Sequence, residues 1–418
     1  MHPLPQSTTR ITFHTSRLPM PRRRFKPGYF ILEGMNSFAV VYYCYYFYFY
    51  MQKVFGFGTK ANLALAALSG AIYTVFSWVG GKFAQRFGGF TALKLGFGLM
   101  IGALAAGTLL SSAPGHILVM SVVFAGMCFT WPTLEALISE GETVAGLPRM
   151  VGIYNMVWAG TAAAANFVGG AMLQNFGLKS LFYIPIAILL CQFALTLWLE
   201  YKARQATERH VLEQGLHPPP EPPAREANSR SLAKAKLFLN MAWLANPFAY
   251  VAINTLIAAV PGVAKRLELS TMLAGFCCSI WCFSRLAAFF VLWRWTGWHY
   301  RFRWLLISYV AMVASFSAIL MAPNVAVLVF AQIIFGVVTG LIYYSSLFYS
   351  MDVGEGKSEH GGLHEAAIGL GNFAGPAVGA VSLYFLPTSV NSGTLAVSGL
   401  LLLGLGGLWT IWRRGKRR

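Results

Sequence analysis

Residues 325–350 read VAVLVFAQIIFGVVTGLIYYSSLFYS, a run of apolar and small polar side chains without a charged residue. At ~1.5 Å of rise per residue, a helix of this length crosses the ~30 Å hydrocarbon core of a bilayer. Comparable runs recur along all 418 residues, so that 56% of the chain is hydrophobic and only 11% is charged. The alternating pattern of barrel strands is absent, so the backbone must be satisfied within helices. The sequence therefore predicts an all-α membrane protein.

Twelve such runs are expected to be transmembrane helices. Their ranges are 29–51, 61–80, 91–111, 115–139, 150–175, 180–200, 237–262, 270–295, 303–322, 325–350, 361–386 and 391–412. The longest polar interruption, 201–236, is proline-rich and charged, which is typical of an extended, solvated linker. The chain should then form two pseudo-symmetric six-helix bundles, 29–200 and 237–412, between a basic arm, 1–28, and a basic tail, 413–418.

The distribution of Lys and Arg predicts the orientation. With both termini in the cytoplasm, 26 of the 32 Lys and Arg residues fall in cytoplasmic segments, an excess typical of membrane proteins. The basic arm lacks an apolar core, so no cleavable signal peptide is expected. We expect a multi-pass protein of a bacterial inner (plasma) membrane with a cytoplasmic arm, linker and tail. The net charge of +18 then favours anionic lipids, and not nucleic acid, as partners.

A faint internal repeat supports two related halves. Asn166–Gly170, NFVGG, lies in the fifth span, and Asn372–Pro376, NFAGP, lies in the eleventh, 206 residues later. Each follows a polar loop that contains Gly and Glu. Duplicated halves are how many secondary transporters build a central site between repeats.

The chain resembles the major facilitator superfamily. The segment GKFAQRFG between the second and third spans is similar to that family's loop motif, although Gln85 occupies its acidic position. Twelve spans, a central linker and inner termini match the family over nearly the whole chain. The resemblance implies a monomeric secondary transporter that works by alternating access around a site near the bilayer midplane. It implies a conformational role for Gly81, Lys82, Arg86 and Gly88.

Ionisable residues inside membrane spans are expensive and mark functional sites by default. Five fall within or at the rim of the spans, on helices that the resemblance places around the cavity: Glu33, Glu135, Arg285, His364 and Glu365. A buried Arg needs an anionic partner, so Arg285 should bind a substrate or take part in coupling, or form a fixed pair with a glutamate, unless its side chain snorkels to the interface. Glu135 could load and release protons, or lie in interfacial water. Glu33 fits a structural role beside the basic arm better.

The first span carries eight aromatic residues in the nine positions from Tyr42 to Tyr50. These rings could form an interfacial belt in part and pack against other helices, or present the hydroxyls of Tyr42 and Tyr46 to a cavity. Other candidates for the cavity wall could equally bond between helices. They are Asn36, Trp131, Asn155, Trp158, Asn254, Gln332, Tyr343 and Asn372.

Enzyme motifs are incomplete in this chain. Gly354–Ser358 lacks the first glycine of a phosphate loop, and His364-Glu365 lacks the second histidine of a zinc-protease helix. We therefore expect neither enzymatic activity nor a cofactor. His360, His364 and Glu365 form a weak candidate for a metal site.

The sequence thus predicts a secondary transporter, a symporter or antiporter, of a small organic solute, with proton coupling as an option. No arginine lies between Pro114 and Glu140, which disfavours a standard proton-driven drug exporter. Two alternatives stay open: a transporter of divalent metals or metal chelates, and a non-transporting receptor or scaffold with the same fold.

Overall fold

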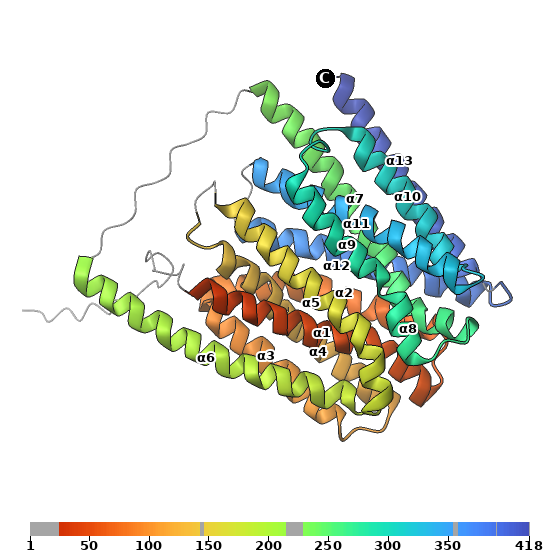
Figure 1. The fold of residues 1–418 in the computed structure, drawn as a ribbon, viewed down its shortest axis with the longest axis horizontal. Coiled ribbons are helices and arrows are strands. Elements are labelled where there is room, and N and C mark those ends of the chain that lie inside the picture. The colour runs from red at the N-terminus through yellow and green to blue at the C-terminus, as the bar shows by residue number, and fades with distance from the viewer. Residues whose placement is uncertain (1–24, 143–145, 215–228, 354–357, 390, 418) are drawn as a thin grey trace, which may run out of the picture.

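The computed structural model describes residues 25–142, 146–214, 229–353, 358–389 and 391–417, which fold into helices joined by turns and short loops (Figure 1). The helices are α1 Lys26–Phe55, α2 Thr59–Phe87, α3 Gly89–Gly107, α4 Ala113–Ser139, α5 Leu147–Asn175, α6 Ser180–Gln214, α7 Ser229–Arg266, α8 Thr271–Cys278, α9 Ile280–Arg294, α10 Phe302–Leu320, α11 Val325–Asp352, α12 Ser358–Phe385 and α13 Ser392–Arg417. Most of the predicted basic arm and the proline-rich part of the predicted linker lie outside the described residues.

The predicted spans each correspond to a helix, except that the eighth is divided at Ser279 into α8 and α9. In the described part of the chain, eleven of these spans are long and apolar enough to cross a membrane. α1 is not among the eleven because its tyrosine hydroxyls lower its hydropathy, yet its 30 residues are long enough to cross. The all-α membrane fold predicted from the sequence is confirmed.

The aromatic stretch of α1 lies inside the protein. Every ring from Tyr42 to Tyr50 is at most 8% exposed, and α1 packs against α4, α5 and α6 and also reaches α7. These rings therefore pack in the core, as the first interpretation in part expected, and do not form an interfacial belt. A central helix meets other helices on all sides, so its rings fill the core between them.

Three helix ends differ from the sequence prediction. α2 continues to Phe87, so Gly81, Lys82 and Arg86 are helical and only Gly88 separates α2 from α3. Gly88 has φ of 90°, a conformation that favours glycine at a tight turn. Helices α6 and α7 also extend into the range 201–236, which we expected to be an extended linker. Polar residues continue a helix easily where it leaves the bilayer, so hydropathy alone misplaces such ends.

The chain forms two six-span bundles, α1–α6 and α7–α13, which occupy different sides of the view in Figure 1. They meet where α2 packs on α12 and where α5 packs on α8 and α9. The first contact joins the second span to the eleventh, and the other joins the fifth span to the eighth. The pseudo-symmetry relates the second span to the eighth and the fifth to the eleventh, so the two contacts are equivalent. Glycines allow both crossings: a Cβ on Gly70 would lie 2.3 Å from the backbone nitrogen of Phe373, and one on Gly170 would lie 2.3 Å from the carbonyl oxygen of Thr271.

The spans alternate in direction, so α1 begins and α13 ends at the same end of the bundle. We call this end the termini face and the other end the opposite face. Near the termini face, Lys94 Nζ and Arg204 Nη2 both donate to the Glu200 carboxylate, at 2.7 and 2.6 Å, which ties α3 to α6. Lys26 at the start of α1 forms an ion pair with Glu142 after α4.

Candidate functional site

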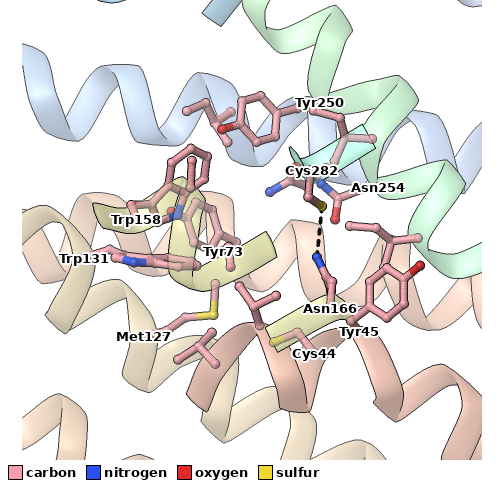
Figure 2. Close-up of a pocket in the computed structure, with 18 of the residues that line it drawn as sticks. Cys44, Tyr45, Tyr73, Met127, Trp131, Trp158, Asn166, Tyr250, Asn254 and Cys282 are labelled. Carbon is pink, nitrogen blue, oxygen red and sulfur yellow. Dashed lines mark hydrogen bonds between the residues drawn. The ribbon is translucent and has the colours of Figure 1, made fainter. Parts of the chain in front are cut away.

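A cavity of about 190 Å³ lies between the two bundles, midway along their helices. The first bundle lines it with α1, α2, α4 and α5, and the second with α7, α9, α11 and α12. These helices include the first, fourth, seventh and tenth spans, which the family resemblance places at a central cavity. In Figure 2, Tyr73, Trp131 and Trp158 lie on one side of this cavity, and Asn166 and Asn254 lie on the other.

Arg285 of α9 reaches this cavity inside a group of aromatic rings. Its guanidinium carbon lies 4.8 Å from the ring centres of Trp158 and Tyr343, 5.5 Å from Phe289 and 5.9 Å from Tyr250. Such distances are typical of cation–π attraction. Trp158 belongs to the first bundle and the other rings to the second, so the guanidinium bridges the bundles.

The hydrogen bonds of Arg285 are incomplete. The residue is only 4% exposed, and its Nε and Nη2 atoms are buried without an acceptor. Within the described residues, no carboxylate forms an ion pair with it, so the fixed Arg285–glutamate pair is not observed there. The rings stabilise the charge in part, but a buried cation still favours an anionic partner.

Two carboxylates, Glu135 of α4 and Glu365 of α12, also line the cavity, toward its termini-face side. Tyr73 of α2 donates a hydrogen bond of 2.5 Å to Glu365 Oε2 and so joins the bundles. Because both acids share a small cavity with Arg285, the charge of a bound solute acts on all three groups.

Amide side chains supply neutral hydrogen-bonding groups. Asn254 of α7 donates to the Asn372 side chain of α12, and Asn166 of α5 donates to Cys282 Sγ at 3.1 Å (Figure 2). Asn166 and Asn372 head the two copies of the internal repeat. Both line the cavity, one from each bundle.

The cavity brings together more than half of the residues that the sequence singled out. Those that line it are Trp131, Glu135, Trp158, Asn254, Arg285, Tyr343, Glu365 and Asn372. All of these lie on helices that face the other bundle.

Six other candidates do not line the cavity, because each is turned toward a neighbouring helix or its own backbone. They are Glu33, Asn36, Tyr42, Tyr46, Asn155 and Gln332. Asn36 accepts a bond from Thr130, Tyr42 pairs with Ser180 at 2.9 Å, Tyr46 donates to the carbonyl of Asn166, Asn155 donates to the carbonyl of Val151, and Gln332 donates to the carbonyl of Cys277. The tyrosines of α1 that line the cavity are Tyr45 and Tyr48 instead.

Glu33 is fully buried beside the cavity. Ser37 Oγ and Trp131 Nε1 donate to its Oε1 at 2.7 and 3.0 Å, and Trp131 itself lines the cavity. The other oxygen, Oε2, is buried without a donor. Glu33 is therefore buried and not at the surface, because α1 packs this residue against α4, whereas the basic arm expected beside it lies largely outside the described residues.

The candidate metal site falls largely outside the described part of the structure. His360 and His364 lie in the first turns of α12, but their side chains are not described. Among the side chains that are described, no three His, Cys, Asp or Glu residues gather in a way that could hold a metal ion.

Sequence reasoning missed several lining residues. They are Cys44, Tyr73, Met127, Tyr154, Tyr250, Trp281 and Cys282. In the sequence, these positions show only a tyrosine, tryptophan or sulfur-containing side chain within an apolar span. Residues that merely pack between helices have the same side chains, so the sequence does not distinguish the two.

A solute-sized cavity between two pseudo-symmetric bundles of membrane-spanning helices is typical of secondary transporters. The family model of the Major Facilitator Superfamily matches residues 118–376, and the chain belongs to this family. It is therefore an integral multi-pass membrane protein of a transporter family, as predicted. No curated protein matches the chain by sequence.

Solved transporter structures share the fold over nearly the whole chain. A structure of the peptide transporter POT superimposes with a TM-score of 0.67 at 14% identity, covering 94% of this chain and 95% of that one. The nucleoside transporter NupG gives 0.66 at 13% identity, covering 93% and 99%. The human organic anion transporter MFSD10 (TETRAN) gives 0.64 at 12% identity, also covering 93% and 99%. At such identities the similarity concerns the fold alone.

Proposed function

We propose that this protein is a secondary active transporter that carries a small organic solute with an anionic group by alternating access. One observation carries the proposal: Arg285 is buried in the central cavity, with two guanidinium nitrogens for which the described residues supply no acceptor. A buried cation of this kind is costly and is retained in membrane spans chiefly where it serves transport.

Contacts between the bundles support an alternating mechanism. Toward the opposite face, Tyr45 donates to the carbonyl of Cys278 at 3.2 Å, and the Met272 amide donates to Gln174 Oε1 at 3.1 Å. These bonds join α1 to α8 and α5 to α8, and they have to break before the cavity can open on that side. On the termini side of Arg285, Trp158 stacks on Phe289 and Tyr343 across the same boundary.

Proton coupling is assigned to Glu135 and Glu365. Both carboxylates share the cavity with Arg285, so a bound anion makes it easier for either of them to take up a proton. A solute and a proton would then cross together, with little net charge left in the low-dielectric centre.

The termini face is assigned to the cytoplasm of a plasma membrane because Lys and Arg are concentrated in the segments at that face. These basic groups would contact anionic lipid headgroups. The cavity is built from the helices of one chain, so a monomer suffices for transport.

The test is solute flux into liposomes that contain the purified full-length chain, with and without an imposed proton gradient. The solutes are organic anions, amino acids, sugars, nucleosides, organic amines and divalent metal ions. We expect saturable flux of an organic anion that is lost in Arg285→Ala but kept in Arg294→Ala, a control at the exposed end of the same helix. Glu135→Gln and Glu365→Gln should abolish accumulation driven by the gradient.

Other outcomes would replace this proposal. Flux of divalent metal alone would favour the metal transporter, and no flux of any solute by folded protein would favour a receptor or scaffold. Saturable anion flux that is unchanged in Arg285→Ala would contradict the role of this residue.

A further inference from the structure

The two unsatisfied nitrogens of Arg285 lie on the same edge of its guanidinium group. Nε and Nη2 point their N–H bonds in parallel, and this edge matches the two oxygens of a carboxylate. Both atoms are buried in a side chain that is 4% exposed and that lines the cavity. The described residues leave the Nε–Nη2 edge of Arg285 without an acceptor. The spacing of its two N–H groups suits a planar anion that offers two oxygens.

Aromatic rings line one side of the cavity that Arg285 enters. Trp158 stacks on Tyr343 and Phe289, at 25° and 26°, with ring centres 5.6 and 6.4 Å apart, so these faces already cover one another. Trp131 and Tyr73 line the cavity on the same side as Trp158 in Figure 2. The ring surfaces left to a solute are those that face the cavity, and a flat, conjugated body packs against them over more of its area than a puckered or branched one.

The other charged groups of the cavity limit the charge of the solute. Among the described lining residues, Arg285 is the only Lys or Arg, whereas Glu135 and Glu365 supply carboxylates. A second negative charge on the solute would have no cation to meet. The far side of the cavity offers amides from Asn166, Asn254 and Asn372, which suit a neutral polar substituent.

The volume limits the size of the solute. About 190 Å³ is less than the ~300–1,000 Å³ of pockets that bind drug-sized molecules. A single ring with short substituents fits this space better than a fused ring system or a peptide.

We propose that the transported solute is a small aromatic monocarboxylate. Its carboxylate binds side-on to Nε and Nη2 of Arg285, its ring stacks beside Trp158, and its neutral substituent faces the asparagines. This inference rests on the transport function proposed above and narrows its substrate class.

The test compares four probes on the purified full-length protein: benzoate, benzamide, cyclohexanecarboxylate and terephthalate. Benzoate provides the ring and the carboxylate together, and the other three test in turn the loss of the charge, the loss of planarity and the addition of a second charge. We expect benzoate to raise the unfolding temperature and to exchange across liposomes, with apparent affinity about tenfold higher than each of the other three. Equal binding of benzamide, cyclohexanecarboxylate or terephthalate would overturn the corresponding part of the proposal.

The side-on geometry has its own test in Arg285→Lys, which keeps the charge but loses the paired donors. We expect the affinity for benzoate to fall about tenfold or more, since an ammonium cannot replace a bidentate guanidinium. Arg294→Lys is the matched control and should bind benzoate as the native protein does.

Two failures are distinguishable. If benzoate does not bind while another solute class shows saturable flux, the aromatic monocarboxylate is wrong and the transport function stands. If no solute of any class is transported by folded protein, both proposals are overturned.

Discussion

Glu33 illustrates how burial decides the chemistry of a single residue. Both of its described hydrogen-bond donors, Ser37 and Trp131, point to Oε1, and Oε2 is buried without a donor. Two titratable groups act on it, Glu135 of α4 as a like charge and Tyr154 of α5 as a hydrogen-bonding neighbour, and neither supplies a positive charge. From α6 the amide of Gln192 donates to the neighbouring Leu32 carbonyl. Because a buried carboxylate without a cationic partner is costly, we expect Glu33 to be the neutral acid.

Replacement of Glu33 tests this protonation state. Glu33→Gln should unfold at nearly the native temperature, because its amide oxygen still accepts from Ser37 and Trp131 while its NH₂ group occupies the place of the protonated oxygen. Glu33→Leu leaves the Trp131 indole N–H with only a long contact to Ser37, at a cost of about 1–3 kcal/mol. Thermal unfolding in detergent measures both variants. If glutamine is as damaging as leucine, Glu33 carries a charge in the folded protein.

Trp158 is the residue of the first bundle that contacts the Arg285 cation. Removing its ring in Trp158→Leu should lower the affinity for the transported anion about 2- to 30-fold, the equivalent of the ~0.5–2 kcal/mol of a cation–π contact. The concentration dependence of flux measures this change. Trp78→Leu is the control, since Trp78 is 60% exposed on the outer surface of α2. An equal loss in both variants would mean that tryptophan stabilises the fold in general.

At the level of helices, the crossing of α2 and α12 depends on backbone contact. A Cβ on Gly70 would meet the backbone of Asn372 and Phe373, and one on Gly369 would lie 2.7 Å from Thr74 Cα. Small residues at helix interfaces in membranes allow such close approach. The two glycines therefore set the distance between the bundles, and with it the width of the cavity.

Gly70→Ala tests this crossing. Backbone atoms cannot rotate away as a side chain can, so the added methyl should separate the helices and lower stability by about 1–3 kcal/mol. Thermal unfolding measures the loss. Gly98→Ala is the control, because a Cβ there has no neighbour within 4 Å. Native stability in Gly70→Ala would show that the crossing can shift, and that its contacts are looser than described.

For the whole molecule, transport requires the contacts near the opposite face to open and close. Gln174 of α5 and Met272 of α8 lie on different bundles and are joined by a hydrogen bond at that face. A short thiol-specific cross-link between cysteines placed at these two positions should block transport and leave the fold intact. The background should carry Cys191→Ser, because Cys191 is the only exposed cysteine of the six.

The control for this experiment is a cross-link within one bundle. Phe176 and Tyr183 lie at the same face, both in the first bundle, and are joined by a hydrogen bond of 2.9 Å. Cysteines at these positions can be linked without restraining the bundles against each other, so flux should persist. Unchanged flux with the 174–272 link would contradict rocking of the bundles at this interface.

Hydropathy predicted most of the fold. In lipid the backbone of each apolar run must satisfy its own hydrogen bonds, so each run forms one helix. Hydropathy misplaced the ends of α2, α6 and α7, since polar residues can extend a helix beyond the bilayer. For the candidate site, the rarity of charge inside spans singled out Arg285, Glu135 and Glu365, and all three line the cavity. The same reasoning could not separate them from Glu33, because hydropathy records depth in the membrane and not direction.

The lengths of the apolar runs and the NFVGG and NFAGP repeats are enough to predict that this chain crosses the membrane repeatedly as two related halves. Which face of each helix meets the other bundle becomes known from the packing of the helices alone. That choice placed Tyr45 at the cavity and Tyr46 beside it, one residue apart. It also surrounded Arg285 with rings from α5, α7, α9 and α11. The physical reason is that rotation about a helix axis is set by packing against neighbours, which no local pattern within an apolar span encodes.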